Sequence, residues 1–283
     1  MRYAVGILAL ALMVGVAYGH LYGPNGEGNP YYMPAVPDEY IPTIDGDLSD
    51  WAWLPSQFVF TPDWFATIGQ FTDQEAQVPK DDFDVIVYGP VWIPSMNMVA
   101  FAIHKVDDIL YAPHEEIRHC WDEDVVQWAV DADHGGEDAG DGNDYQQCFF
   151  TPKQGGHVGV FQGGGTVDWI YTEPYAYWAA KIQDNGSFDF EIMMTLWDWA
   201  DATGPDASTK HMLKAGEIIG FSVEVCDADS DSEIEFPDVE FDYGNIAVGG
   251  SVLPDWLLMP VEETLKLLPV GSDTWGRIKA SFK

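Results

Sequence analysis

Apolar and polar residues alternate along much of this chain, in short runs that end at Gly, Pro, Asp or Asn. A period of two is typical of a β-strand with one buried face, and the bounding residues favour turns. Within 124–133, Val126, Trp128 and Val130 share one face, which predicts that Trp128 lies in the core. We predict strands in eight segments, namely residues 83–92, 96–108, 124–133, 145–152, 156–162, 166–183, 188–196 and 217–229.

Helical signals are few by comparison. Only residues 196–204, as a short turn, and the last twenty residues favour a helix. Many short strands separated by turn signals predict an all-β fold, an antiparallel β-sandwich of jelly-roll type with a short C-terminal helix or tail. Residues 20–40 are rich in Gly, Pro and Tyr, which predicts an extended lead-in without regular structure.

The N-terminal segment has a different pattern. It combines Arg2 with an apolar run from Ala4 to Val16 and a small residue at Gly19. This pattern predicts a secretory signal peptide, because the apolar run is shorter than the roughly 20 residues that span a bilayer. We therefore expect a secreted protein, extracellular or periplasmic, with no membrane insertion after cleavage. The predicted divisions are a signal peptide (1–19), an extended lead-in (20–40), a β-sandwich (41–262) and an amphipathic tail (263–283).

The chain is strongly acidic, with a formal charge of −35 that becomes −36 once Arg2 is removed. Such a field repels nucleic acid and anionic membrane surfaces, so we expect no nucleic-acid partner. A content of 47% hydrophobic and 14% aromatic residues argues against disorder. Three cysteines, Cys120, Cys148 and Cys226, are an odd number, and the sequence leaves open which pair, if any, forms a disulfide.

Several landmarks follow one another in a fixed order between residues 41 and 248. They are IDGDLSDW, a strand pair ending in VDD, WDEDVVQWAVDAD, a strand with glutamines, DFEIMMTLWDW, IGFSVEVCDADSD and FDYGNIAV. This order resembles carbohydrate-binding module family 9 and its relatives in a DOMON-like superfamily. The resemblance implies a secreted β-sandwich that binds a glycan or oligosaccharide and carries calcium ions as structural supports. In its first landmark, Asp45-Gly46 predicts a tight turn, and we expect Leu48, Trp51 and Trp53 to close one end of the core.

The same resemblance implies aromatic contacts to the sugar. Members of the family hold a sugar between two tryptophans, and Trp121 matches the first of them. The segment that corresponds to the second tryptophan has none, so Phe236 or Phe241 would take its place. Aromatic rings suit this role because they offer a large contact area at a low entropic cost. A core or edge position for Trp121 is the alternative.

Polar contacts are implied as well. Asp124 belongs to the motif that starts at Trp121. Gln147 matches the first residue of the family pattern Q-x-R-x-N, whereas Phe149 and Thr151 stand at the arginine and asparagine positions. These departures leave open which sugar the chain binds, and whether it binds one at all.

Carboxylates crowd the loop DADHGGEDAGDGND. Like charges so close together repel one another unless water or a cation screens them, and calcium takes six to eight oxygen ligands from such loops. A solvated acidic loop is the alternative. The first predicted set of calcium ligands is Asp131, Asp133, Glu137, Asp138, Asp141 and Asp144, and a second set is Asp227 and Asp229 in CDADSDSE.

Catalytic motifs such as GxSxG, HExxH or a phosphate-binding glycine loop do not occur in the sequence. Among 47 acidic residues a glycosidase-like carboxylate pair would arise by chance, so we expect a protein that is not an enzyme. Two alternatives stay open. One is an assembly β-sandwich that has lost its sugar site and binds a protein partner through the C-terminal tail. The other is a periplasmic haem-binding electron-transfer subunit, with candidate ligands among the seven histidines, Met193 and Met194.

Overall fold

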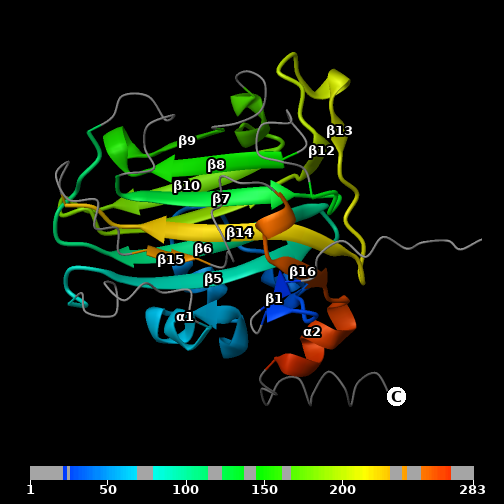
Figure 1. The fold of residues 1–283 in the computed structure, drawn as a ribbon, viewed down its shortest axis with the longest axis horizontal. Coiled ribbons are helices and arrows are strands. Elements are labelled where there is room, and N and C mark those ends of the chain that lie inside the picture. Colours follow the sequence, from blue (N-terminus) through cyan, green and yellow to red (C-terminus); the bar gives the residue numbers. More distant parts are fainter. Residues whose placement is uncertain are drawn as a thin grey trace, which may run out of the picture.

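The fold is a sandwich of two β-sheets (Figure 1). The structure is a computed structural model, which describes residues 22–23, 26–68, 79–113, 123–136, 145–160, 167–229, 238–240 and 250–268. Within these ranges one sheet has five strands in the order β10-β11-β6-β5-β4. The other has seven, in the order β3-β16-β14-β7-β8-β9, with β15 also paired to β14. The predicted antiparallel β-sandwich is confirmed.

The elements have the following bounds. The five-stranded sheet contains β10 (Ala176–Ile182), β11 (Phe188–Met194), β6 (Met98–Val106), β5 (Asp84–Ile93) and β4 (Val59–Phe60). The seven-stranded sheet contains β3 (Tyr31–Met33), β16 (Asp255–Leu258), β14 (Ile218–Cys226), β7 (Val125–Asp131), β8 (Tyr145–Thr151), β9 (His157–Val160) and β15 (Asp238–Glu240). Two further pairs are β1 (Tyr22–Gly23) with β2 (Gly26–Glu27), and β12 (Trp197–Trp199) with β13 (Thr209–Lys210). The α-helices are α1 (Pro62–Ile68) and α2 (Val261–Leu267).

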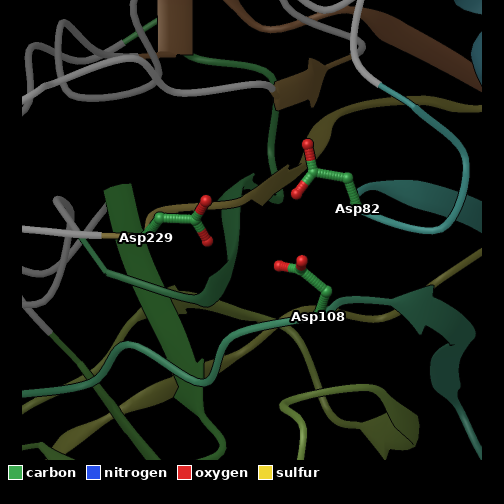
Figure 2. A group of neighbouring side chains, drawn as sticks. All are labelled: Asp82, Asp108 and Asp229. Carbon is green, nitrogen blue, oxygen red and sulfur yellow. The ribbon is translucent and has the colours of Figure 1, made fainter.

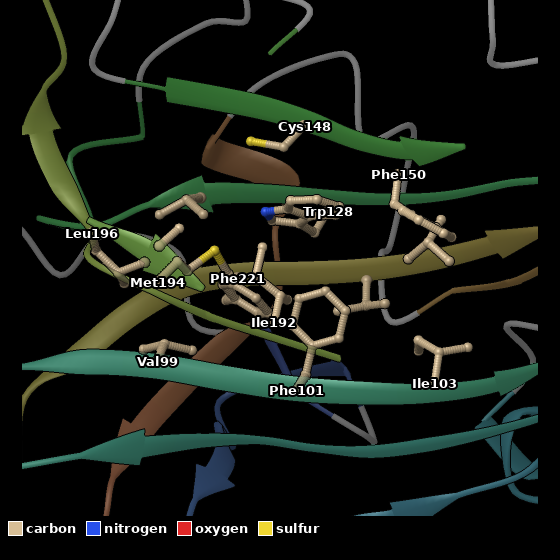
Figure 3. Close-up of a cluster of buried hydrophobic side chains, with 14 of the residues drawn as sticks. Val99, Phe101, Ile103, Trp128, Cys148, Phe150, Ile192, Met194, Leu196 and Phe221 are labelled. Carbon is tan, nitrogen blue, oxygen red and sulfur yellow. The ribbon is translucent and has the colours of Figure 1, made fainter. Parts of the chain in front are cut away.

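The hydrophobic core lies between the two sheets, where alternate residues of facing strands meet (Figure 3). Trp128 of β7 is fully buried, as its position in the period-two pattern predicts. Its ring contacts Phe101 of β6 in a T-shaped arrangement, with 5.6 Å between the ring centroids. Phe150 of β8 stacks on Phe190 of β11 at 4.2 Å. Because these aromatic pairs join strands of opposite sheets, they fix the sheets against each other.

Several segments differ from the sequence prediction. Predicted strand 166–183 begins with a 3-10 helix, Asp168–Tyr171, ahead of β10. Residues 20–40 contain β3, which runs parallel to β16. The partner of β3 lies near the other end of the chain, so the local sequence pattern does not indicate that residues 31–33 form a strand. Residues 196–204 contain β12 and not a helical turn, because Trp197 and Trp199 pair with β13. Helix α1 is not predicted at all. The predicted signal peptide (1–19) and residues 269–283 of the predicted tail (263–283) lie outside the described residues.

The turn at Asp45-Gly46 is held by a buried carboxylate. Gly46 has a positive φ of 80°, as the turn requires. The Glu191 carboxylate on β11 accepts hydrogen bonds from the backbone N–H groups of Asp45 and Gly46, at 2.5 and 2.6 Å. Its second oxygen accepts one from Trp51 Nε1 at 3.0 Å. Trp51 is 1% exposed, so the N-terminal landmark closes this part of the core as predicted.

Candidate functional site

Polar residues lie on the side of the seven-stranded sheet that faces away from the core, and most of them are shielded from solvent. Strands β7, β8 and β14 turn alternate side chains away from the core, and the pairing register aligns them. Ser222, Ala129 and Gln147 lie side by side in one cross-strand row. Glu224, Gln127 and Phe149 form the next row. We call these six residues the polar strip.

Five of the six residues of the polar strip are buried, and Glu224 is half-buried. Gln127 is 4% exposed, Gln147 is 3% exposed and Ser222 is fully buried. The Gln147 amide donates to Gln127 Oε1 at 3.4 Å, and the Gln127 amide contacts Cys226 Sγ at 3.6 Å. The Ser222 hydroxyl makes no hydrogen bond within the described part of the chain. A buried hydroxyl without a partner costs free energy unless water or a ligand pairs with it, so this strip can bind a polar molecule.

The predicted sugar contacts divide into two groups. Gln147 lies on the polar strip beside Phe149, and Thr151 follows on the same face of β8, so the sequence pattern and the sheet agree on which residues point together. The predicted stacking residues Trp121, Phe236 and Phe241 lie outside the described residues. Sequence reasoning missed Gln127 and Ser222, although both stand at outward positions of strands that the period-two pattern identified.

Asp124 lies inside the protein, at the end of the sandwich. One of its oxygens lies 2.7 Å from Lys105 Nζ and also accepts from the Ala228 N–H, and the other accepts from the Tyr111 N–H at 2.6 Å. Asp124 is fully buried. Its carboxylate is therefore engaged by the protein itself, and a direct contact between Asp124 and a ligand stays a prediction.

Lys105 is the centre of a buried ion cluster. Its ammonium lies 2.8 Å from an oxygen of Asp107, 2.7 Å from Asp124 and 2.8 Å from Asp227. The ammonium donates hydrogen bonds to Asp107 and Asp124, whereas its contact with Asp227 Oδ1 is an ion pair without hydrogen-bond geometry. Lys105 is the last residue but one of β6 in one sheet, whereas Asp124 precedes β7 and Asp227 follows β14 of the other. The cluster therefore joins the two sheets at one end of the sandwich.

Burial and charge act in opposite directions in this cluster. Burial alone would lower the pKa of Lys105, but the carboxylates of Asp124, Asp227 and Asp107 outweigh it and raise that pKa above its usual range. Burial also raises the pKa of Asp124 and of Asp227, against the effect of Lys105. Three carboxylates surround this ammonium, so Lys105 itself is the cation of this acidic cluster.

A second acidic group lies at the surface next to it (Figure 2). Asp82 precedes β5, Asp108 follows β6 and Asp229 follows β14, and one oxygen from each lies within 4.8 Å of the others. We call these residues the aspartate triad. Figure 2 shows the three carboxylates turned toward one another. Asp82 is half-buried and the other two are exposed.

The aspartate triad can hold a divalent cation. Burial, then the charges of Asp108 and Asp229, raise the pKa of Asp82. Burial, then the charge of Asp108, raises the pKa of Asp229. Carboxylates that repel one another in this way are the oxygen donors that calcium prefers. The sequence predicts Asp227 and Asp229 as ligands of one calcium ion, but Asp227 contacts Lys105 and Asp229 belongs to the aspartate triad.

The two acidic groups explain two sequence landmarks together. In VDD, Asp107 faces Lys105 and Asp108 joins the aspartate triad. In DAD, Asp227 faces Lys105 and Asp229 joins the triad. Each landmark therefore supplies one carboxylate to the buried cluster and one to the surface. Asp82 gave no signal in the sequence, because it stands among other acidic residues before a strand.

The other predicted calcium loop is described only in part. Asp131 is buried, and its two oxygens accept hydrogen bonds from the N–H groups of Gly135 and Gly136, at 3.0 and 2.9 Å. Asp133 is exposed and also accepts from Gly135. These bonds give Asp131 a role in shaping the turn. Glu137, Asp138, Asp141 and Asp144 lie outside the described residues, so a calcium ion in this loop stays a prediction.

Several candidate haem ligands and cysteines have other partners. His104 hydrogen bonds to Asp189 at 2.7 Å, and His211 bonds to Asp198 at 2.5 Å. Met194 lies in the core. Among the described cysteines, Cys148 and Cys226 are both buried and neither is in a disulfide bond, and Cys120 lies outside the described residues.

No helix in the described ranges is long and apolar enough to cross a membrane. No protein-family model and no curated protein sequence matches the chain.

Solved structures do resemble the chain. A carbohydrate binding module family 9 from Caldicellulosiruptor kristjanssonii, in complex with cellotriose, superposes with a TM-score of 0.51 at 14% identity, over 82% of this chain and 94% of that one. The module of that name in complex with glucose gives a TM-score of 0.50 at 14% identity, over 81% and 95%. At this identity the likeness establishes the fold and not the ligand. The chain thus has the fold of family 9 carbohydrate-binding modules, in agreement with the order of its sequence landmarks.

Proposed function

We propose that this chain is a secreted, non-catalytic carbohydrate-binding protein whose fold is supported by calcium. The observation that carries the proposal is the polar strip on β7, β8 and β14, where the Ser222 hydroxyl has no hydrogen-bond partner among the described residues. A polar ligand would supply the partner that this buried hydroxyl needs. The proposed occupant is a neutral sugar.

The polar strip offers the groups that a sugar needs. A side-chain amide both donates and accepts hydrogen bonds, and so does a hydroxyl, which matches the dual character of sugar hydroxyl groups. Gln127 and Gln147 supply two amides in adjacent rows. Ser222 supplies the hydroxyl, and Phe149 supplies an apolar surface in the row of Gln127. The proposed stacking residues are Trp121 on one side of the sugar and Phe236 or Phe241 on the other.

The fold supports a sugar ligand in a second way. The two modules with the same fold were solved in complex with cellotriose and with glucose, which are both neutral sugars. Both are binding modules by name, in line with the absence of catalytic motifs from this sequence. Export follows from the proposed signal peptide at residues 1–19, and an extracellular or periplasmic location would bring the protein to its glycan.

Calcium is proposed at the aspartate triad. Asp82, Asp108 and Asp229 would supply three carboxylate oxygens, and water would complete the shell of six to eight. The raised pKa values of Asp82 and Asp229 support this assignment, because a cation would relieve the repulsion that contributes to raising them. Residues of the acidic loop, from Asp131 to Asp144, are proposed as a second calcium site. The ion would stabilise the fold and would not contact the sugar, because the polar strip consists of other residues.

Calorimetric titration tests the sugar claim. Glucose and cellotriose are titrated in calcium buffer into the mature protein, into Trp121→Ala, and into Trp199→Ala as a control tryptophan on β12. We expect binding heat with the parent and with the control, and its loss with Trp121→Ala. Absence of heat with these and other neutral oligosaccharides would remove the proposal.

A further inference from the structure

An aromatic pocket of about 640 Å³ lies between β3, α1, β16 and the end of α2, and it shares no residue with the polar strip. Tyr31 of β3 and Trp256 of β16 form one wall, stacked with 4.6 Å between ring centroids and 21° between planes. Trp64 of α1 packs against Phe60 of β4, at 4.5 Å. A pocket of this volume is large enough for a small organic ligand.

Two aromatic rings of the pocket reach solvent. Tyr32 alternates with the buried Tyr31 and is 54% exposed, and Trp64 is half-buried. Both line the pocket. Exposed aromatic rings next to a pocket give a flat apolar ligand a surface on which to stack.

Amide groups complete the pocket. Asn29 and Gln57 line it, and both residues are exposed. Neither side chain makes a hydrogen bond within the described part of the chain. Their donors and acceptors are therefore available to a ligand that presents hydroxyl groups at its edge.

Charge narrows the ligand further. The described lining residues include no Asp, Glu, Lys, Arg or His, although the chain holds 47 acidic and 12 basic residues. A charged ligand would find no partner in the pocket, and an anionic one would be repelled by the net charge of −35. Apolar faces, hydroxyl edges and no charge together describe a neutral saccharide.

We propose that the pocket lined by Tyr32, Trp64, Asn29 and Gln57 is a second saccharide-binding site, separate from the polar strip. It shares only its ligand class with the proposed function. A protein with two such sites on different parts of the sandwich would hold a glycan at two points, or hold two glycan chains.

Calorimetry with matched variants tests the proposal. The neutral trisaccharides cellotriose, xylotriose and maltotriose are titrated into the mature protein, and trigalacturonate is titrated as an anionic probe. The variants are Tyr32→Ala and Gln57→Ala, each also made in the Trp121→Ala background. Met212→Ala, at a residue that is 57% exposed, and Gln183→Ala serve as controls for an exposed apolar and an exposed amide side chain.

We expect at least one neutral trisaccharide to bind, and to bind roughly tenfold more weakly in Tyr32→Ala, the loss expected for one stacking contact. Gln57→Ala should weaken it as well, the controls should not, and trigalacturonate should not bind. Unchanged affinity and stoichiometry in Tyr32→Ala and Gln57→Ala would overturn the second site. If the Trp121→Ala background alone abolishes binding, the polar strip stands and the second site falls. If only Tyr32→Ala and Gln57→Ala lose binding, the second site stands and the sugar site at the polar strip falls.

One further variant tests a rival occupant. Leu267 lines the pocket, and the chain continues into residues 269–283, which carry Trp275, Ile278 and Phe282. Should this tail fill the pocket, Trp275→Ala would strengthen saccharide binding, and that result would overturn the proposal. We expect no change in affinity.

Discussion

Lys105 and Asp124 come from opposite sheets and lie 2.7 Å apart, both fully buried, at one end of the sandwich. Asp107 and Asp227 complete the group around the same ammonium. In this fold a lysine therefore takes the place that a metal ion would take among three carboxylates. The nearby aspartate triad of Asp82, Asp108 and Asp229 has no such lysine among the described residues.

Removing the ammonium should destabilise the protein strongly. Lys105→Met leaves three buried carboxylates without their cation, and we expect a loss of about 3–5 kcal/mol in the free energy of unfolding. Urea denaturation measures it. Lys266→Met, at an exposed lysine paired with Glu263, is the control and should change stability by less than about 1 kcal/mol. Equal effects of the two substitutions would contradict the role given to Lys105.

Glu191 should be as important for stability as Lys105, because it holds the turn of the IDGDLSDW landmark. Glu191→Ala leaves the Trp51 indole N–H and two backbone N–H groups without their acceptor, and we expect a loss of about 3 kcal/mol or more. Glu191→Gln keeps an acceptor oxygen and should lose less. Thermal or urea unfolding gives both values. A neutral effect of Glu191→Ala would mean that the turn at Gly46 holds without this carboxylate.

Chelation should lower the melting temperature by several degrees. A calcium ion that binds only the folded state stabilises it by RT ln(1 + [L]/Kd), which is about 2.7 kcal/mol at a hundredfold excess over Kd. The shift between calcium and EDTA buffers should become smaller in Asp108→Asn/Asp229→Asn, where any remainder would come from the acidic loop, and should stay unchanged in Asp184→Asn. A full shift in the double variant would contradict a calcium ion at the aspartate triad, and no shift in the parent would contradict a structural ion.

The described thiols should be unreactive in the native protein. Burial raises the pKa of the Cys148 thiol, which also accepts a hydrogen bond from the Tyr171 hydroxyl, and Cys226 is 2% exposed. Since the thiolate is the reactive form, at most one thiol per chain should react with Ellman's reagent before unfolding, and more should react in urea. Fast reaction of Cys148 or Cys226 in the native state would contradict the packing of β8 or β14.

Strand positions could be predicted because each long strand carries its own period-two pattern. Val126, Trp128 and Val130 face the core as that pattern requires. Strand β3 could not be predicted, because the strand it pairs with, β16, lies near the other end of the chain. The three residues of β12 could not be predicted either, since two tryptophans spaced by one residue fit a turn as well as a strand.

The buried ion cluster around Lys105 has a weaker signal in the sequence, which becomes clear once the structure is known. Val99, Phe101 and Ile103 occupy inward positions of β6, and Lys105 continues the same series. A charge at an inward position of a strand indicates a buried ion pair, but not with which residues. Two of its three partners, Asp124 and Asp227, come from other places in the chain, which only the fold brings together.

The amide groups of the polar strip allow the most direct test of sugar binding. In a nuclear magnetic resonance titration with cellotriose, the side-chain amide signals of Gln127 and Gln147 should shift in a saturable way, while those of Gln183 should not move. Saturation with unchanged Gln127 and Gln147 signals, or no change anywhere at millimolar cellotriose and other neutral oligosaccharides, would contradict the claim that this face of the sandwich binds a sugar.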